Sequence, residues 1–219
     1  MCWDLNIKLQ QNIEKNFQVF CSLKMKFPIF PLNGAILFPK TNLPLNIFEK
    51  RYLQMVDYAL ANNRIIGMIQ KKENEEYFNI GCFGKITNFT ETTDGRYQIN
   101  LEGISRFSIN KIYNDDYKFV LIDGQILNFN NQTIDDDLSK KLLKVFKNYL
   151  DTKKIKFDTK GFNNLDSLNL GKIICVISPL DHLTKQMLLE YNNFGDFFEN
   201  LISALEIEIK STESSTIIN

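Results

Sequence analysis

The chain has 219 residues, of which 44% are apolar, and its 26 basic residues balance its 26 acidic residues to a formal net charge of zero. This length and composition suit a globular protein with one large domain or two small ones. The balanced charge excludes a general electrostatic attraction to nucleic acid or to an anionic membrane, so partners must be inferred from local features.

Residues 1–24 form an N-terminal extension without the apolar core and the cleavage site of a signal peptide. Four of its apolar residues recur at helical spacing and predict an amphipathic helix: Leu9, Ile13, Phe17 and Phe20. Alternatively, Met25 is the true start and the extension is an over-called start. No segment approaches the roughly 20 apolar residues of a membrane span, and we expect a cytoplasmic protein.

Four of the five prolines lie between residues 27 and 52, namely Pro28, Pro31, Pro39 and Pro44. Proline lacks a backbone N–H and favours extended backbone before it, so this segment predicts short strands joined by bends. Such strands belong at the edges and corners of a curved or partly open sheet. After Pro44, apolar residues at helical spacing predict a helix from about Phe48 to Asn62, with Phe48 on its apolar face.

The next segment is rich in strand signals. We predict a strand over 64–70, a charged connection over 71–76 and a strand over 81–92. An Asp-Gly turn at 93–96 then predicts a hairpin, because Tyr97, Ile99 and Leu101 alternate with polar residues in the returning strand. The runs "RFSINKIY" and "KFVLIDGQIL" predict two further strands.

The second half of the chain is predicted to be helical after a polar link near residue 130. Acidic residues at 135–137 precede a helix whose apolar face is formed by Leu138, Leu142, Val145, Phe146 and Tyr149. The run "DSLNLGKIICVIS" fits a buried strand or a helix, and 181–191 and 196–209 predict helices. Residues 211–219 are expected to be a flexible, frayed tail.

Catalytic and metal-binding signals are missing from the sequence. There is no phosphate loop, no nucleophile elbow and no H-E-x-x-H, and the four cysteines show no metal-ligand spacing. The single histidine, His182, follows Ser178 and Asp181 so closely that a helix cap explains them better than a catalytic triad. We therefore predict no enzymatic activity, no cofactor and no metal.

Two charge features remain. The segment Lys140 to Lys160 holds eight lysines and two aspartates, which we interpret as a solvated face or, alternatively, an RNA-binding face. Three of the four arginines directly precede an aromatic residue: Arg51, Arg96 and Arg106. Because a guanidinium can bond with two donors and stack on a ring, we expect structural pairing, with Arg51 or Arg106 bound to Glu49 or Glu102.

An ordered series of motifs, "FPLN…LFP…LPLNIFEKRYLQMV", "IGCFGKI" and "TTDGRYQINLEGISRF", runs over residues 26–127. This series resembles the N-terminal, substrate-binding domain of the Lon protease family, and "LTKQMLLE" extends the resemblance to about residue 205. The residues that carry it, expected to be structural, are Pro31, Leu32, Pro44, Phe48, Glu49, Arg51, Tyr52, Asp94, Gly95, Arg96, Gly103, Arg106 and Phe107.

The resemblance implies an α+β fold: a PUA-like six-stranded β pseudo-barrel with one early helix, followed by an α-helical bundle. It implies a barrel over 25–128 and a helical subdomain over 129–210, after the extension over 1–24 and before the tail over 211–219. Full Lon enzymes continue into an ATPase module and a serine-lysine protease domain, whose motifs these 219 residues lack. The recognition part alone is implied.

The resemblance favours a non-catalytic module that recognises unfolded or exposed polypeptide segments in protein quality control, with a protease or a chaperone as candidate partner. The alternative is an RNA-binding or ribosome-associated factor that uses the barrel and the face from Lys140 to Lys160. For polypeptide binding we name Phe38, Pro39 and Leu43, beside a bend between two early strands. Their alternative role is packing in the barrel core.

Overall fold

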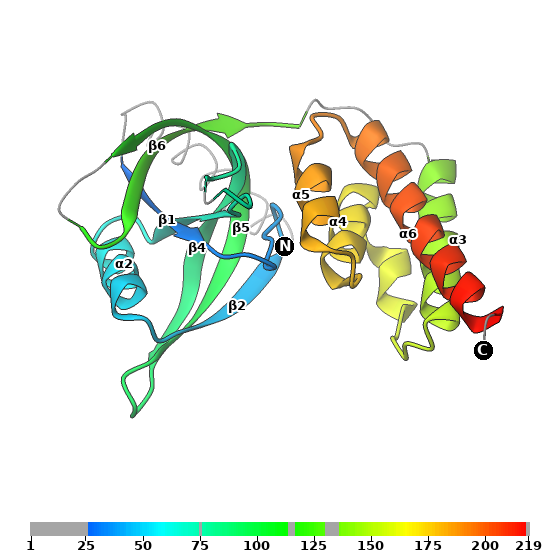
Figure 1. The fold of residues 1–219 in the computed structure, drawn as a ribbon, viewed down its shortest axis with the longest axis horizontal. Coiled ribbons are helices and arrows are strands. Elements are labelled where there is room, and N and C mark those ends of the chain that lie inside the picture. The colour runs from blue at the N-terminus through cyan, green and yellow to red at the C-terminus, as the bar shows by residue number, and fades with distance from the viewer. Residues whose placement is uncertain (1–25, 75, 114–116, 130–135, 218–219) are drawn as a thin grey trace, which may run out of the picture. The chain divides into compact units, whose positions relative to one another are not determined.

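The computed structural model describes residues 26–74, 76–113, 117–129 and 136–217 (Figure 1). The chain divides into two compact units, Met1–Leu127 and Asn128–Asn219. In the described residues the first unit is mostly β-sheet and the second is helical. The helix expected within residues 1–24 lies outside the described part of the chain. Among the helices that are described, none combines the length and apolar character needed to cross a membrane.

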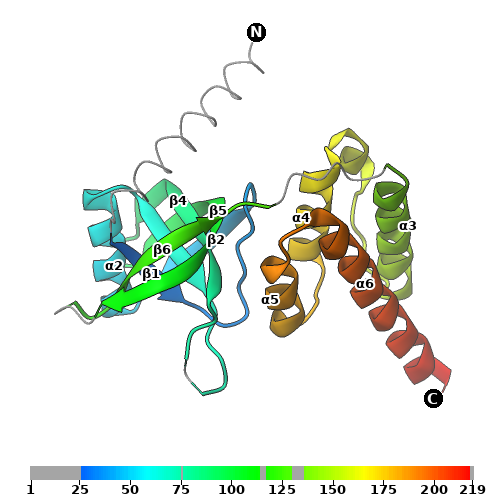
Figure 2. The same cartoon turned by 90° about the horizontal axis from the view of Figure 1, so that it is seen from above.

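The β unit is a six-stranded sheet that curves into a ring (Figures 1 and 2). Its strands are β1 (Phe27–Pro31), β2 (Asn42–Ile47), β3 (Ile65–Ile69), β4 (Ile80–Glu91), β5 (Tyr97–Tyr113) and β6 (Val120–Leu127). The strand order is β2-β5-β4-β3-β1-β6, and a further β5–β6 pairing closes five strands on themselves. This arrangement confirms the predicted α+β pseudo-barrel.

β5 is a single strand of 17 residues where the sequence predicted two separate strands. β5 pairs with β2 over residues 97–102, with β4 over residues 97–108 and with β6 over residues 106–113. The register shifts beside it, at Ile86/Asn88 on β4 and at Ile109/Lys111 on β5 itself, are the irregularities that let a long strand bend. One strand can therefore serve both sides of the ring.

The prolines lie where extended, curved backbone was predicted. Pro28 and Pro31 belong to β1, Pro39 lies in the turn before β2, and Pro44 lies within β2. Among the described strands β2 pairs only with β5, so Pro44 is on a sheet edge, as its missing N–H favours. The predicted bend is confirmed: the Thr41 N–H donates to the Phe38 carbonyl at 3.1 Å.

Helix α2 (Lys50–Ala61) packs beside β1 and β3 (Figure 1). Its buried residues Met55, Val56 and Ala59 join the larger of two apolar clusters in this unit. The sequence pattern predicts that this helix starts at Phe48 and that the Phe48 ring lies on its apolar face. The structure corrects this prediction, because Phe48 precedes the helix and 66% of its surface is exposed.

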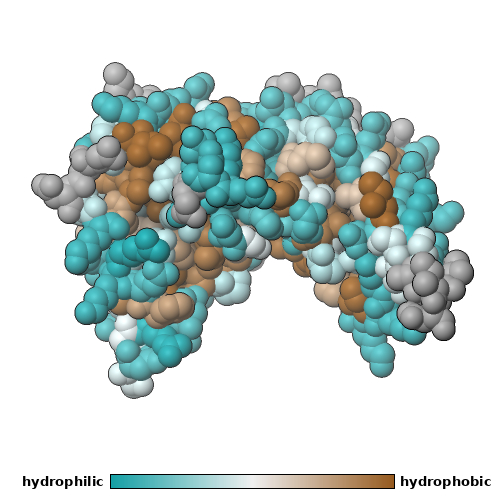
Figure 3. All heavy atoms as spheres, in the orientation of Figure 1, coloured by the Kyte–Doolittle hydropathy of each residue, from teal (hydrophilic) through white to brown (hydrophobic). Residues whose placement is uncertain are grey.

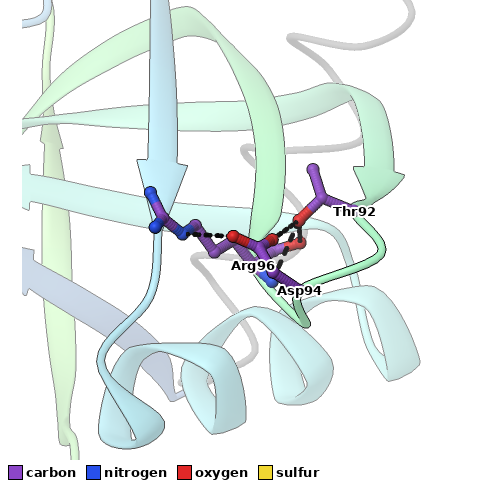
Figure 4. A network of polar contacts seen from close by, with 3 residues as sticks. All are labelled: Thr92, Asp94 and Arg96. Atoms are coloured by element: carbon purple, nitrogen blue, oxygen red, sulfur yellow. Dashed lines mark hydrogen bonds and ion pairs between the residues drawn. The ribbon is translucent and has the colours of Figure 1, made fainter.

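The hairpin between β4 and β5 closes at the predicted Asp-Gly turn (Figure 4). Gly95 has φ +79°, a conformation that favours glycine. The Thr92 hydroxyl donates to the Asp94 carboxylate, which also pairs with Arg96 at 2.8 Å. The Thr92 hydrogen bond, helped by Arg96, lowers the pKa of Asp94 below its ordinary value. Arg96 thus has a structural partner within its own turn.

The second unit consists of α3 (Asp136–Thr152), a short 3-10 helix η1 (Lys160–Asn164), α4 (Ser167–Ile177), α5 (His182–Glu190) and α6 (Phe194–Ile217). The run that fitted a strand or a helix is α4, so the helical alternative is confirmed. Residues 211–217 are the last turns of α6 and not the frayed tail that was predicted. Asp181 caps α5 by accepting from the N–H groups of Leu183 and Thr184, as expected.

Candidate functional site

The structure buries most of the side chains that the sequence analysis named for polypeptide binding. Phe38 has an exposed fraction of 0%, Pro39 is buried, and Leu43 is half-buried. A Cβ atom on Gly103 would lie 2.0 Å from the Phe38 carbonyl oxygen, which shows how closely β5 backs this segment. Of the two roles considered for Phe38, its burial favours packing in the barrel core.

A pocket of about 390 Å³ lies elsewhere in the β unit, where the ends of β1 and β2 meet the start of α2. We call it the Phe48 pocket. It is lined by Phe30, Pro31, Leu32, Asn33, Leu45, Asn46, Ile47, Phe48, Glu49, Arg51, Tyr52 and Lys71. These residues come from two short segments, 30–33 at the end of β1 and 45–52 from the end of β2 to the first turn of α2, together with Lys71, which follows β3.

Part of the lining of the Phe48 pocket is apolar. Phe30 and Tyr52 are buried, and their ring centroids lie 4.4 Å apart. Leu32 and Leu45 are half-buried along the walls, while the Phe48 ring is exposed at the rim. A hydrophobic side chain entering the pocket would therefore contact aliphatic and aromatic surface on several sides.

Charged groups line the rim of the same pocket. The Nε–H of Arg51 donates to Oε2 of Glu49 at 2.9 Å, and Nη2 of Arg51 lies 2.9 Å from the same oxygen in an ion pair. The Arg51 guanidinium also lies over the Tyr52 ring, with Cζ 4.5 Å from the centroid. Burial raises the pKa of Tyr52, partly offset by Arg51, so the phenol is neutral at physiological pH. The predicted pairing of Arg51 with Glu49 is confirmed.

Sequence reasoning expected the residues of this pocket to be structural. Six of the residues that carried the Lon resemblance line it: Pro31, Leu32, Phe48, Glu49, Arg51 and Tyr52. One signal could have revealed it. β2 alternates exposed and buried residues up to Ile47, which is buried, so an adjacent apolar Phe48 has to face the other way.

The remaining residues that carried the resemblance support the fold. Asp94, Gly95 and Arg96 form the hairpin turn, and Gly103 allows close packing against the Phe38 carbonyl. Arg106 and Phe107 are completely buried in β5. Burial lowers the pKa of Arg106 to about 10, which still leaves the guanidinium charged at neutral pH.

A second, more open pocket of about 540 Å³ lies on another side of α2. Its aromatic lining consists of Tyr58, Tyr117 and Phe119, whose rings contact one another at centroid distances of 4.9 to 5.5 Å. Tyr117 is 51% exposed. These rings pack mainly on each other, so they form a cluster with an exposed edge.

In Figure 3, hydrophobic side chains also gather on the visible face of the β unit, amid hydrophilic ones.

Three other candidate features of the described residues are a metal site, a reactive cysteine and the lysines of α3. The described residues contain no group of three His, Cys, Asp or Glu that could hold a metal ion. Cys175 is buried, and burial raises its pKa to about 12, so this thiol is not a nucleophile at neutral pH. On α3, Lys140, Lys144 and Lys147 are exposed, and Lys140 pairs with Asp137 at 3.3 Å.

Comparison with known proteins gives a family match over most of the chain. The family model described as "ATP-dependent protease La (LON) substrate-binding domain" matches residues 26–206. The Lon protease of Buchnera aphidicola subsp. Baizongia pistaciae is 26% identical over 200 residues, which cover 84% of this chain and 25% of that protein. Lon protease 1 of Bacillus subtilis is 26% identical over 208 residues, covering 86% and 27%. The chain thus spans about a quarter of the length of these relatives.

Solved structures show the same fold. The "Lon N-terminal domain protein from Xanthomonas campestris" superposes with a TM-score of 0.65 at 18% identity, over 82% of this chain and 98% of that one. The "N terminal domain of Mycobacterium avium complex Lon protease" gives a TM-score of 0.62 at 15% identity, over 83% and 98%. At these identities the likeness concerns the arrangement of the backbone.

Proposed function

Because the chain belongs to the family of the ATP-dependent protease La (Lon) substrate-binding domain, we propose that its β unit binds unfolded or exposed polypeptide segments at the Phe48 pocket. The observation that carries this proposal is the exposed Phe48 ring at a pocket whose lining combines apolar side chains with polar and charged ones. Large rings exposed at a pocket rim are typical anchors for a partner.

The composition of the pocket suits a polypeptide ligand. Its volume falls within the range of about 300–1,000 Å³ that is usual for ligand sites. Apolar walls formed by Leu32 and Leu45 would contact a hydrophobic side chain, while Asn33 and Asn46 on the exposed rim could hydrogen-bond to an extended backbone. A folded client hides such side chains, whereas an unfolded one presents them.

The proposed role is recognition without catalysis. The 219 residues contain neither a phosphate loop nor a recognisable catalytic motif, and the described residues assemble no metal site. We therefore expect the purified chain to show no ATP-stimulated degradation of casein. Degradation that copurifies with the chain and resists removal of contaminating proteases would contradict this expectation.

Substitution of Phe48 tests the proposal. Phe48→Ser should weaken binding of a labelled, chemically unfolded lactalbumin by about tenfold, measured by fluorescence anisotropy. The thermal midpoint should stay nearly unchanged, because the ring is 66% exposed and contributes little to the core. Tyr117→Ser is the matched control, since it removes another exposed ring of the same unit outside the pocket. Equal binding by wild type and Phe48→Ser would refute the assignment of the site.

An RNA-binding role is the second candidate, supported by the exposed Lys140, Lys144 and Lys147 on α3. Residues 128–219 nevertheless hold 11 lysines and 13 acidic residues, so this basic face belongs to a unit of negative net charge. RNA binding through phosphate contacts would weaken steeply with salt, and replacing the three lysines by Glu would abolish it. RNA binding that changes neither with salt nor with the lysine substitutions would exclude this candidate function.

A further inference from the structure

We infer that the Phe48 pocket selects polypeptide segments that carry a carboxylate next to an apolar side chain, and that Glu49 occupies the place of this carboxylate on Arg51 until such a segment binds. This inference rests on the proposed polypeptide binding and names the class of segment. The charged groups of the pocket would provide this selectivity, whereas its apolar side chains would contact any hydrophobic segment.

The first support is the charge of the pocket lining. Three charged residues contribute to it, Glu49, Arg51 and Lys71, so cations outnumber anions. The rest of the lining is apolar or carries neutral amides and a phenol. A ligand that is complementary to both parts combines a hydrophobic side chain with a negative charge.

The second support is the geometry of the Glu49–Arg51 pair. Both Nε and Nη2 of Arg51 converge on a single oxygen, Oε2, of Glu49. The strongest arrangement of a guanidinium and a carboxylate is two parallel hydrogen bonds to two different oxygens. A ligand carboxylate that approaches the same edge of the guanidinium in that arrangement would bind better than Glu49 does.

The third support is that the pair is exchangeable. The Arg51 and Glu49 side chains are 52% and 46% exposed, and ion pairs in water contribute little to stability. Displacing Glu49 returns its carboxylate to water and leaves no buried charge behind. Arg51 itself stays in place, because its guanidinium rests on the Tyr52 ring, which Phe30 backs at a centroid distance of 4.4 Å.

The carboxylate could come from an Asp or Glu side chain or from the C-terminus of a chain, and labelled peptides separate these sources. All three peptides contain a Phe-Leu pair. The first has Asp beside the pair and an amidated C-terminus, and the second has Asn in place of Asp and an amidated C-terminus. The third has Asn in place of Asp and a free C-terminal carboxylate directly after the pair. We expect at least one carboxylate peptide to bind the wild-type chain about tenfold more tightly than the neutral one by anisotropy.

Two variants give opposite results if the inference is right. Arg51→Gln should remove the preference for the carboxylate, so that the carboxylate peptides and the neutral peptide bind this variant alike. Glu49→Gln should strengthen binding of the carboxylate peptide severalfold, because the competing carboxylate is gone. The matched control is the hairpin pair Asp94–Arg96, which has similar exposure outside the pocket: Asp94→Asn and Arg96→Gln should leave all three affinities unchanged.

The possible outcomes distinguish a failure of this inference from a failure of the proposed polypeptide binding. If the neutral peptide binds and loses affinity with Phe48→Ser, while Asp and free C-terminal peptides bind no better, the pocket binds polypeptide but the inference is wrong. If Glu49→Gln weakens binding of the carboxylate peptide, Glu49 is a ligand contact and the displacement idea is wrong. If no peptide binds in a way that depends on Phe48, the proposed function itself fails.

Discussion

The guanidinium of Arg51 makes three interactions that lysine could not reproduce together, yet solvent limits what they contribute to folding. Were the pair partly buried, Arg51→Lys would cost about 1–3 kcal/mol. Because both side chains are about half exposed, we now expect a loss below about 1 kcal/mol in urea unfolding. Arg96→Lys, at a comparably exposed pair, should behave alike, and a loss well above this value at Arg51 alone would contradict the reasoning.

Phe38 is the buried counterpart of Phe48, and the same substitution should act on it in the opposite way. Phe38→Ser leaves a cavity and a buried hydroxyl in the core, so it should destabilise the chain by about 3–5 kcal/mol or more. Chemical unfolding monitored by circular dichroism measures this loss. An unchanged midpoint would mean that the ring is not part of the core.

These two phenylalanines show what local patterns can and cannot predict. Both lie in the proline-rich segment, where the alternation of β2 turns Phe48 away from the buried Ile47 but no such regular pattern surrounds Phe38. Phe38 is buried because Gly103, far along the chain, brings β5 against its backbone. The burial of Phe38, in an irregular segment, is decided by such distant packing, which the neighbouring residues in the sequence do not reveal.

At the level of single elements, the cap of α5 offers a test by pH. Hydrogen bonds from Thr184 and Leu183 lower the pKa of Asp181. A carboxylate with a lowered folded pKa stabilises the protein above its unfolded pKa of about 3.9, and this contribution is lost as the pH falls through the folded pKa. Asp181→Ala should therefore cost about 0.5–2 kcal/mol at neutral pH and progressively less in acid.

Two companions make the test of this cap specific. Asp181→Asn keeps an acceptor for the helix N-terminus and should retain most of the stability without the acid dependence. Asp151→Ala removes an exposed aspartate near the C-terminal end of α3 and should be neutral or slightly stabilising. Unfolding curves at neutral and acidic pH measure all three variants. A cost for Asp181→Ala that persists unchanged in acid would show that packing, and not the charge, is lost.

Most elements followed from periodicity and turn chemistry, and the misses have identifiable causes. The Asp-Gly hairpin, β3 and the helices of the second unit carry their signals within a few residues. β5 was divided in two near Ile104, where its pairing with β4 shifts register although the strand continues. α2 was begun too early because Phe48 fits the helical period although it lies outside the helix.

At the scale of the whole molecule, the division into two units predicts that the first unit binds polypeptide without the second. Every residue of the Phe48 pocket belongs to the first unit. A fragment of residues 26–127 should therefore fold with a strand-rich circular dichroism spectrum and bind the unfolded lactalbumin with about the affinity of the full chain. If the folded fragment fails to bind, residues of the second unit contribute to recognition and the assignment to one unit is wrong.

The position of Pro44 on the edge strand β2 bears on a hazard that any receptor for unfolded chains faces. An open sheet edge can template the addition of further strands, so that receptor and ligand would coassemble into aggregates. Pro44 has no N–H to offer, and it interrupts the row of donors along the strand whose last residues line the pocket. Under the proposed function, the chain would hold a client by its side chains beside an edge that resists amyloid-like growth.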